Sequence, residues 1–134
     1  MSTTPEKPLI LIADDRPSSR ELLRLVLERA GYAVVEAEDG EQALAVARTE
    51  NPDLILLDLQ MPGLDGYGVL SALRRDARFV HLPVLALTAS AMRGDRERIL
   101  AAGFTDYLAK PAGPETLRDT VARLLERRTS EAAS

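Results

Sequence analysis

Residues 54–66 read LILLDLQMPGLDG, an unbroken apolar run that ends at Asp58 and passes into a turn with one Pro and two Gly. A run in which consecutive residues are apolar, rather than every second one, is typical of a strand covered on both faces of a parallel sheet. The turn residues mark the end of that strand. An amphipathic helix is expected next, with its apolar stripe at Val69, Leu70 and Leu73.

The same order of an apolar run and an amphipathic segment recurs along the chain. Gly31 is the expected stop of the first helix, and Asp39, three residues before Gln42, is the expected start of the second. Strict alternation with short connections argues for a parallel sheet with helices on both faces, joined by right-handed crossovers. Five strands are too few for a β/α barrel, so we predict an α/β fold with an open, doubly wound sheet. The expected strands are 9–13, 32–37, 54–57, 84–87 and 107–109, and the expected helices lie at 17–29, from 39 to 50, after 66, at 94–102 and after 114.

The composition excludes several classes of protein. The chain has 134 residues and a net charge of −4, so the concentrated basic face of most nucleic-acid-binding proteins is not expected. It has no Cys and one His, which excludes disulfides, thiol catalysis and Cys-ligated zinc. No apolar run is long enough to span a membrane, and the first residues lack the apolar stretch of a signal peptide. We expect a cytoplasmic domain at residues 9–128, with an N-terminal extension at 1–8 and a disordered tail at 129–134.

Polar side chains stand at the ends of four of the predicted strands. Asp14 and Asp15 follow the first strand, Asp58 the third, Thr88 the fourth and Lys110 the fifth. The carboxyl ends of parallel strands meet at one edge of a doubly wound sheet, where such sheets bind ligands. Each residue alone has an ordinary interpretation as a helix cap, a turn former, a strand residue or a surface lysine. Together, the three carboxylates would repel one another unless positive charge lay among them.

A divalent cation beside the Lys110 ammonium would relieve that repulsion. Oxygen ligands without His or Cys select Mg²⁺, or Mn²⁺ in its place, over zinc. A carboxylate beside such an ion can attack a phosphoryl group and form an aspartyl phosphate. The cation, the lysine and a hydroxyl such as that of Thr88 would then stabilise the phosphoryl oxygens. The strand-end residues include all of these protein groups.

Four short motifs lie at the predicted strand ends: ADD at 13–15, LDLQMPGLDG at 57–66, LTA at 87–89 and KP at 110–111. In order and spacing they resemble the receiver domains of two-component response regulators, and the match extends from about Leu9 to Leu125. The resemblance implies a flavodoxin-like (βα)5 sheet with strand order 2-1-3-4-5. Residues 91–95 are similar to single-domain cell-cycle regulators and to receivers of hybrid kinases, so we expect the single-domain chemotaxis or cell-cycle type.

The resemblance also implies roles for the acidic residues. Asp58 matches the carboxylate that accepts a phosphoryl group from a histidine kinase or a histidine phosphotransfer protein. Asp14 and Asp15 match the acidic pair that holds Mg²⁺ beside it. The main-chain carbonyl of Gln60 matches a further ligand of the same ion. Phosphorylation of Asp58 is therefore expected to depend on Mg²⁺.

The resemblance further implies how phosphorylation is read out. Thr88 and Lys110 match the hydroxyl and the amine that contact the phosphate, and Tyr107 matches an aromatic switch residue that moves with Thr88. The face formed by the fourth helix, the fifth strand and the fifth helix is where receivers meet a downstream protein or form a phosphorylation-dependent homodimer. The protein would then be a switch and not a turnover enzyme. No direct contact with nucleic acid or membrane is expected.

Positions beside the motifs vary among receivers. Gln60 and Ser90 occupy positions that tune dephosphorylation, and Ala89 is a small residue that leaves room for the phosphoryl group. The Lys110–Pro111 bond is typically cis in the family, which spacing alone does not show. Gln60 and Ser90 are thus expected to bear on the rate of dephosphorylation rather than on the type of reaction.

Two other functions fit the same predicted fold. An aspartate-nucleophile phosphatase of the haloacid dehalogenase type would need an acid two residues after the nucleophile, where this chain has Gln60, and a longer chain for a substrate-covering cap. Such an enzyme would turn over a phosphate ester, whereas a receiver is labelled once. A flavin or nucleotide carrier would have to place its phosphate beside Asp14 and Asp15. It would bind a nucleotide or be coloured when purified.

Overall fold

The computed structural model describes residues 7–89 and 93–133 of the chain. In these residues all five predicted strands and all five predicted helices are present, and a short 3₁₀ helix is added between α3 and β4. The strands are β1 (Leu9–Ala13), β2 (Ala33–Ala37), β3 (Leu54–Asp58), β4 (Val84–Thr88) and β5 (Asp106–Ala109). The helices are α1 (Pro17–Arg29), α2 (Gly40–Glu50), α3 (Gly66–Arg74), the 3₁₀ helix η1 (Ala77–Phe79), α4 (Arg93–Ala102) and α5 (Pro114–Ala133).

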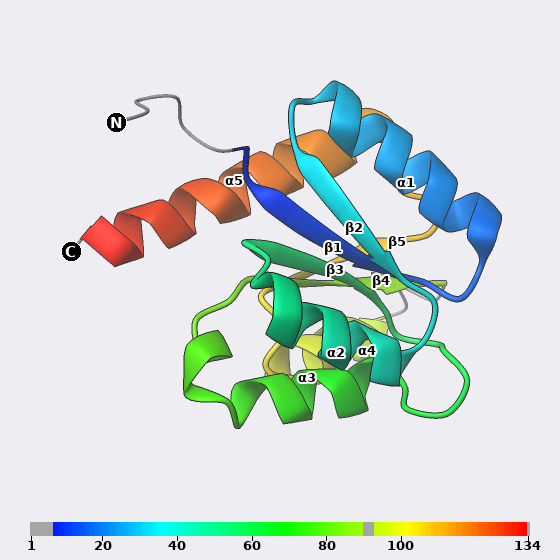
Figure 1. Cartoon of the computed structure of the whole chain (residues 1–134). Coiled ribbons are helices and arrows are strands. Elements are labelled where there is room, and N and C mark those ends of the chain that lie inside the picture. Colours follow the sequence, from blue (N-terminus) through cyan, green and yellow to red (C-terminus); the bar gives the residue numbers. More distant parts are fainter. Residues whose placement is uncertain (1–6, 90–92, 134) are drawn as a thin grey trace.

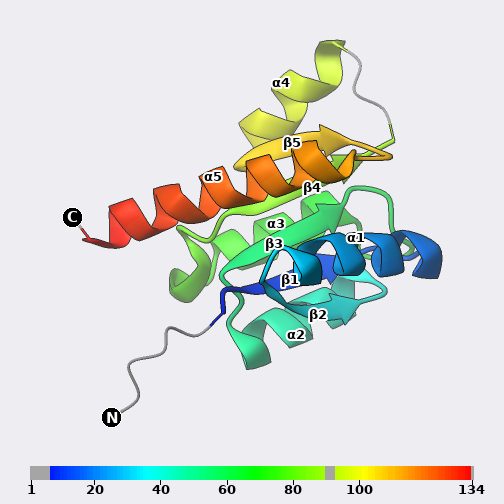
Figure 2. The same ribbon diagram turned by 90° about the horizontal axis from the view of Figure 1, so that it is seen from above.

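The strands form one parallel sheet in the order β2-β1-β3-β4-β5. Helices α1 and α5 cover one face of this sheet, and α2, α3 and α4 cover the other (Figure 1, Figure 2). The direction of winding reverses between β1 and β3, so the loops that follow these two strands diverge at the carboxyl edge. The predicted doubly wound sheet and its strand order are confirmed.

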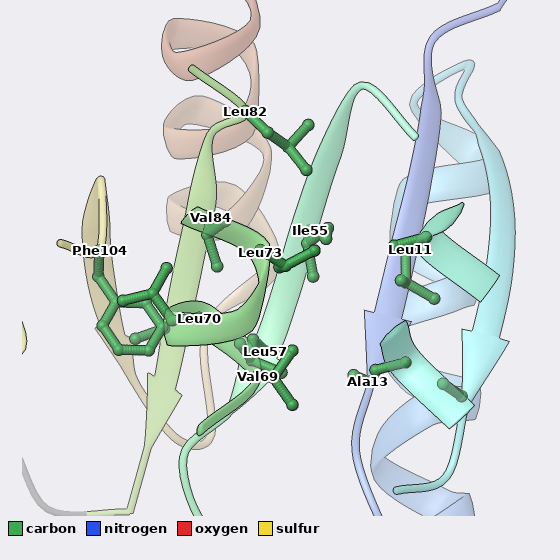
Figure 3. Packing of buried hydrophobic residues seen from close by; sticks show 14 of the residues in the cluster. Leu11, Ala13, Ile55, Leu57, Val69, Leu70, Leu73, Leu82, Val84 and Phe104 are labelled. Atoms are coloured by element: carbon green, nitrogen blue, oxygen red, sulfur yellow. The ribbon is translucent and has the colours of Figure 1, made fainter. Parts of the chain in front are cut away.

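The strands supply side chains to two cores, because successive side chains point to opposite faces of a strand. In β3, Ile55 and Leu57 belong to the core that α2, α3 and α4 cover, whereas Leu54 and Leu56 belong to the core under α1 and α5. Figure 3 shows the first of these cores, with the apolar side of α3 against the sheet. Every residue of β3 is buried. The strand that carries Asp58 is therefore fixed from both sides.

The ends of the first two helices follow the predicted local signals. Gly31 has a φ of 100° and closes α1 with its N–H bonded to the Glu28 carbonyl at 3.0 Å. Helix α2 begins with the Asp39 carboxylate accepting a hydrogen bond from the Gln42 N–H at 2.8 Å. The side-chain oxygen of Gln42 accepts in turn from the Glu38 N–H, one residue earlier than in the standard capping box.

Helix α5 is longer than the sequence pattern predicts. It runs to Ala133, so residues 129–133 continue the helix where a disordered tail was expected. The final residues contain no Gly or Pro, and Glu and Ala among them are good helix formers. Backbone propensity therefore extends the helix beyond the last residue that the core requires.

Some of the residues singled out from the sequence are not described by the structure. Ser90, which was expected to tune dephosphorylation, lies outside the described residues, as do residues 91 and 92 of the segment that resembles single-domain regulators. Residues 1–6 of the expected N-terminal extension and Ser134 are also outside them. Among the helices that are described, none combines the length and the apolar character needed to cross a membrane.

Candidate functional site

Four strands bring the candidate residues to the carboxyl edge of the sheet. β1 ends one residue before Asp14, β3 ends in Asp58, β4 ends in Thr88, and Lys110 directly follows β5. Because these strands pair in parallel, their last residues lie along one edge (Figure 1). Asp15 extends the set by one residue beyond Asp14. The side chains of Asp14, Asp15, Asp58 and Lys110 meet there, as the spacing predicts.

The Lys110 ammonium joins two of the carboxylates. Its Nζ donates to Asp14 Oδ2 at 2.9 Å and to Asp58 Oδ2 at 3.0 Å. The Lys110 N–H donates to the Thr88 carbonyl at 2.8 Å, which ties the lysine backbone to β4, and the bond to Pro111 is cis. Burial lowers the Lys110 pKa, but the two carboxylates outweigh burial and raise the pKa above its ordinary value. The lysine is therefore a fixed positive charge at neutral pH.

Asp14 is the most stabilised of the three anions. Its side chain is fully buried, which by itself raises its pKa. Lys110 and the Ser19 hydroxyl both donate to Oδ2, and the Arg16 N–H donates to Oδ1 at 2.9 Å. Together these donors outweigh burial and lower the pKa of Asp14 below its ordinary value. Asp14 is thus held as a carboxylate with a fixed orientation.

Asp58 is also buried, but fewer donors hold its carboxylate. Only 5% of it is exposed, and its two oxygens accept from the Gln60 N–H at 2.9 Å and from Lys110. Burial raises the pKa of Asp58, the neighbouring Asp14 charge raises it further, and the two donors offset only part of this. A carboxylate with a raised pKa is more basic, and it is therefore a better nucleophile than one in water.

Asp15 is the exposed member of the acidic group. Its carboxylate and those of Asp14 and Asp58 place oxygen atoms within 4.8 Å of one another. Three carboxylates beside one lysine leave negative charge uncompensated, and a set of oxygen ligands without His or Cys is what Mg²⁺ prefers. The residues present therefore fit the divalent cation that the sequence predicts.

A cleft of about 560 Å³ opens beside these residues. It lies between the start of α1, the loop after β3 and the segment after β5, and its lining includes Asp58, Gln60 and Lys110. Ala89 and Ala112 also line it, and their small side chains leave the approach to Asp58 open. Asp58 is therefore enclosed by protein and yet accessible to a phosphoryl donor.

A comparison with known families shows to which family the chain belongs. The model of the response regulator receiver domain matches residues 10–122, which include all of the sheet except Leu9 and all four strand-end motifs. The chain belongs to the response regulator receiver family. Two solved structures show how closely this receiver keeps the family fold. Chemotaxis protein CheY4 of Vibrio cholerae is 35% identical with a TM-score of 0.83 over 88% of this chain and 98% of its own. A putative response regulator from Chloroflexus aurantiacus is 37% identical with a TM-score of 0.86 over 90% and 99%.

The curated relatives of this receiver differ in length. The polar-differentiation response regulator DivK of Brucella ovis is 38% identical over 112 residues, which are 84% of this chain and 91% of DivK. The probable transcriptional regulator ycf27 of Porphyridium aerugineum is 41% identical over 129 residues, which are 96% of this chain and 52% of that protein. The chain thus spans about half the length of the ycf27 relatives that it matches.

The two residues that the resemblance assigned to a switch lie on paired strands of the receiver. Thr88 is buried at the end of β4 and pairs with Ala109 of β5. Tyr107, two residues earlier in β5, is half-buried and packs against the core beneath α2, α3 and α4. Thr88 and Tyr107 therefore lie on paired strands, two residues apart in register.

Sequence reasoning missed two residues that the structure places at the site. The Ser19 hydroxyl donates to the Asp14 carboxylate, and Arg20 Nη1 donates to the main-chain oxygen of Asp14 at 2.7 Å. Both are polar residues in the first turn of α1, where polar residues are common. One signal pointed to Arg20: Glu36 interrupts the apolar pattern of β2, and its carboxylate accepts from Arg20 Nε at 3.1 Å.

Proposed function

We propose that this receiver accepts a phosphoryl group on Asp58 from a histidine kinase or a histidine phosphotransfer protein, in a Mg²⁺-dependent reaction. The observation that carries the proposal is the setting of the Asp58 carboxylate. It is buried, held by the Gln60 N–H and the Lys110 ammonium, and open to a cleft. Its raised pKa supports a role as nucleophile.

The transfer exchanges one bond to phosphorus for another. An oxygen of Asp58 forms the new P–O bond while the P–N bond to the donor's imidazole breaks, and the electron pair of that bond stays on the imidazole nitrogen. Lys110 already contacts Asp58, so its ammonium is placed to pair with the phosphoryl oxygens as charge develops on them. A Mg²⁺ ion held by Asp14, Asp15, Asp58 and the main-chain carbonyl of Gln60 would supply further positive charge to the same oxygens.

Phosphorylation would be read out through β4 and β5. The added negative charge draws the Thr88 hydroxyl toward the phosphoryl group, and Tyr107 moves inward into the space that Thr88 leaves. The surface that changes is formed by α4, β5 and α5, where a downstream protein or a second copy of the chain would bind. The half-buried position of Tyr107 supports this role. The protein is then a switch that acts on its own carboxylate rather than a turnover enzyme.

Intact-mass analysis tests the phosphoacceptor. The parent, incubated with acetyl phosphate and Mg²⁺, is expected to gain one phosphoryl group per chain, and a chelator is expected to prevent this. Asp58→Asn should gain none, whereas Asp119→Asn, which changes an exposed acid on α5, should label like the parent. Labelling of Asp58→Asn at the parental rate would contradict the proposal. Continuous turnover of a phosphate ester would favour a phosphatase instead.

Nuclear magnetic resonance tests the switch separately. Phosphorylation of the parent is expected to shift amide signals around Asp58 and also near Tyr107 and Leu117. Thr88→Ala should still be phosphorylated, though more slowly, and should lose the shifts near Tyr107 and Leu117. Shifts confined to the loop around Asp58 in the parent would show that no such switch operates.

A further inference from the structure

A chain of ion pairs leads from the acidic site across α1 to the edge strand β2. Arg20 stands at its inner end, where Nη1 donates to the Asp14 main-chain oxygen and Nε donates to Glu36. Arg24 stands at its outer end and pairs with both Glu36 and Glu28. The Arg20 side chain is 13% exposed and that of Arg24 is 43% exposed, so Arg20 is the member enclosed by protein. Figure 2 shows α1 lying over the β1 and β2 side of the sheet.

The hydrogen bond from Arg20 to the Asp14 carbonyl lies just after the last residue of β1. β1 pairs with β2 along its whole length, and the Asp14 N–H still donates to a carbonyl of β2 at 3.1 Å. The Asp14 carbonyl lies beyond this ladder, and Arg20 is its donor. The peptide unit between Asp14 and Asp15 is therefore held by Arg20, which is itself held by Glu36 on the neighbouring strand.

The position of the Asp15 carboxylate depends on the orientation of that peptide unit more than the positions of the Asp14 and Asp58 carboxylates do. The carboxylates of Asp14 and Asp58 are buried and bonded to Lys110. Asp15 is exposed, and within residues 7–89 and 93–133 no hydrogen bond or ion pair holds its carboxylate. Because a peptide unit is planar, its rotation would swing Asp15 away from the cluster while Asp14 and Asp58 stayed in place.

We propose that Arg20 is a positioning residue of the acidic site. By donating to the Asp14 carbonyl it fixes the Asp14–Asp15 peptide, and it thereby keeps the Asp15 carboxylate beside those of Asp14 and Asp58. This inference rests on the proposed function, which gives Asp15 a divalent cation to hold. It also accounts for Glu36, the one charged side chain in an otherwise apolar strand, as the anchor of Arg20.

Electrostatics alone predicts the opposite effect of removing Arg20. A positive side chain near an acidic site repels a divalent cation, so Arg20→Met without a change of geometry would strengthen cation binding. Loss of positioning would weaken it, and partners that orient metal ligands are commonly worth about 10- to 100-fold in affinity. The sign of the change therefore distinguishes a positioning role from a purely electrostatic one.

Titration of the full chain with Mn²⁺ alone, followed by the electron paramagnetic resonance signal of the free ion, measures this sign. Arg20→Met is expected to bind Mn²⁺ about 10-fold more weakly than the parent. Arg20→Lys keeps the charge but has one nitrogen for two acceptors, so it should recover only part of the loss. Arg24→Met removes the outer ion pairs alone and should bind Mn²⁺ like the parent. If Arg20→Met does not fold, Arg20→Gln, which is equally neutral but keeps a polar side chain, should show the same direction of change.

The same substitution made in an Asp15→Asn variant shows whether Arg20 acts on Mn²⁺ binding by way of Asp15. In Asp15→Asn, the further change Arg20→Met should no longer weaken Mn²⁺ binding, because the ligand that Arg20 positions is already lost. Equal or tighter binding by Arg20→Met alone would overturn the inference and leave the proposed function standing. A 10-fold loss that persists in the Asp15→Asn background would overturn it as well. Absence of Mn²⁺ binding by the parent would contradict the proposed function, and the inference with it.

Discussion

Lys110 and Arg74 lie at opposite edges of the sheet, and their partners differ in kind. Lys110, at the carboxyl edge, pairs with two carboxylates, which raise its pKa. Arg74, at the end of α3, donates to neutral backbone carbonyls. Such acceptors satisfy hydrogen bonds without compensating the charge, and burial accordingly lowers the pKa of Arg74. Its acceptors are the carbonyls of Phe79, Val80, Leu82 and Gly103.

This difference indicates that Arg74, at one edge of the sheet, stabilises the fold, whereas Lys110, at the carboxyl edge, serves the proposed reaction. Arg74 joins the end of α3 to the segment before β4 and to the turn before β5, and none of these backbone groups takes part in the proposed reaction. Lys110 contacts the carboxylates that would hold a cation and a phosphoryl group, so its partners change during the reaction. Substitution of Lys110 should therefore mainly slow phosphorylation, and substitution of Arg74 should mainly lower the free energy of unfolding.

Replacement of Lys110 should have the largest effect on function. Lys110→Met removes the cation that pairs with the phosphoryl oxygens, so the rate of labelling by acetyl phosphate is expected to fall by about 100- to 1000-fold. The far-ultraviolet circular dichroism spectrum in Mg²⁺ should remain that of a folded protein. A labelling rate within a few-fold of the parental rate would contradict the role of Lys110 in phosphoryl transfer.

Replacement of Arg74 should have the largest effect on stability. Arg74→Met leaves several partly buried carbonyls without their donor, and the free energy of unfolding is expected to fall by about 2–3 kcal/mol. Urea denaturation measures this, with labelling of the folded variant expected to stay near the parental rate. Arg75→Met is the matched control. Among the described residues, the exposed Arg75 side chain bonds only to Ser71, so the variant should change stability by less than about 0.5 kcal/mol. Equal losses in the two variants would contradict the structural role of Arg74.

Two glycines of α3 test how tightly the backbone approaches the site. A Cβ on Gly66 would lie 2.7 Å from the Asp58 carbonyl oxygen, whereas a Cβ on Gly68 would meet the tip of the Leu64 side chain. Gly66→Ala must displace backbone, so we expect a loss of about 1–2 kcal/mol in unfolding free energy and slower labelling. In Gly68→Ala the Leu64 side chain can rotate, and the gain in helix propensity of about 1 kcal/mol offsets the crowding. Urea denaturation and labelling rates that do not distinguish the two variants would contradict this close approach.

The smallest expected effects are on how stability depends on pH, which should differ between Asp58→Asn and Asp14→Asn. The raised pKa of Asp58 means that its ionisation opposes folding, so metal-free Asp58→Asn should be more stable than the parent at pH 7. This advantage should disappear as the pH falls below the ordinary value of 3.8. The lowered pKa of Asp14 has the opposite sign: Asp14→Asn should be less stable at neutral pH, and the deficit should vanish only as the pH falls through the lowered pKa. Parallel pH profiles for both variants, measured by urea denaturation with a chelator, would contradict the assignment.

Much of the fold could be predicted because its decisive signals are local. β3 is apolar at consecutive positions because helices cover both of its faces, and Asp39 starts α2 through a bond to a residue three positions away. The site edge follows from the same pattern, because parallel strands that end in polar residues must bring those residues together. Asp14, Asp58 and Lys110 are therefore found where sequence reasoning expected them.

Contacts between distant elements could not be predicted in this way. Arg74 reaches a carbonyl 29 residues along the chain, and backbone carbonyls carry no sequence signature. Arg20 meets Glu36 16 residues away, and only the charged residue in an apolar strand gave any hint of it. The end of α5 was also missed, because residues 129–133 form a helix without the apolar period by which helices are recognised.

Three acids share the site, and the proposed function requires that Asp58 alone carries the phosphoryl group. Borohydride reduces an aspartyl phosphate to homoserine, which peptide fragmentation then locates along the chain. After incubation of the parent with acetyl phosphate and Mg²⁺, we expect homoserine in place of Asp58 and at no other position. Homoserine in place of Asp14 or Asp15, or a phosphorylated chain that yields no homoserine, would contradict the proposed function.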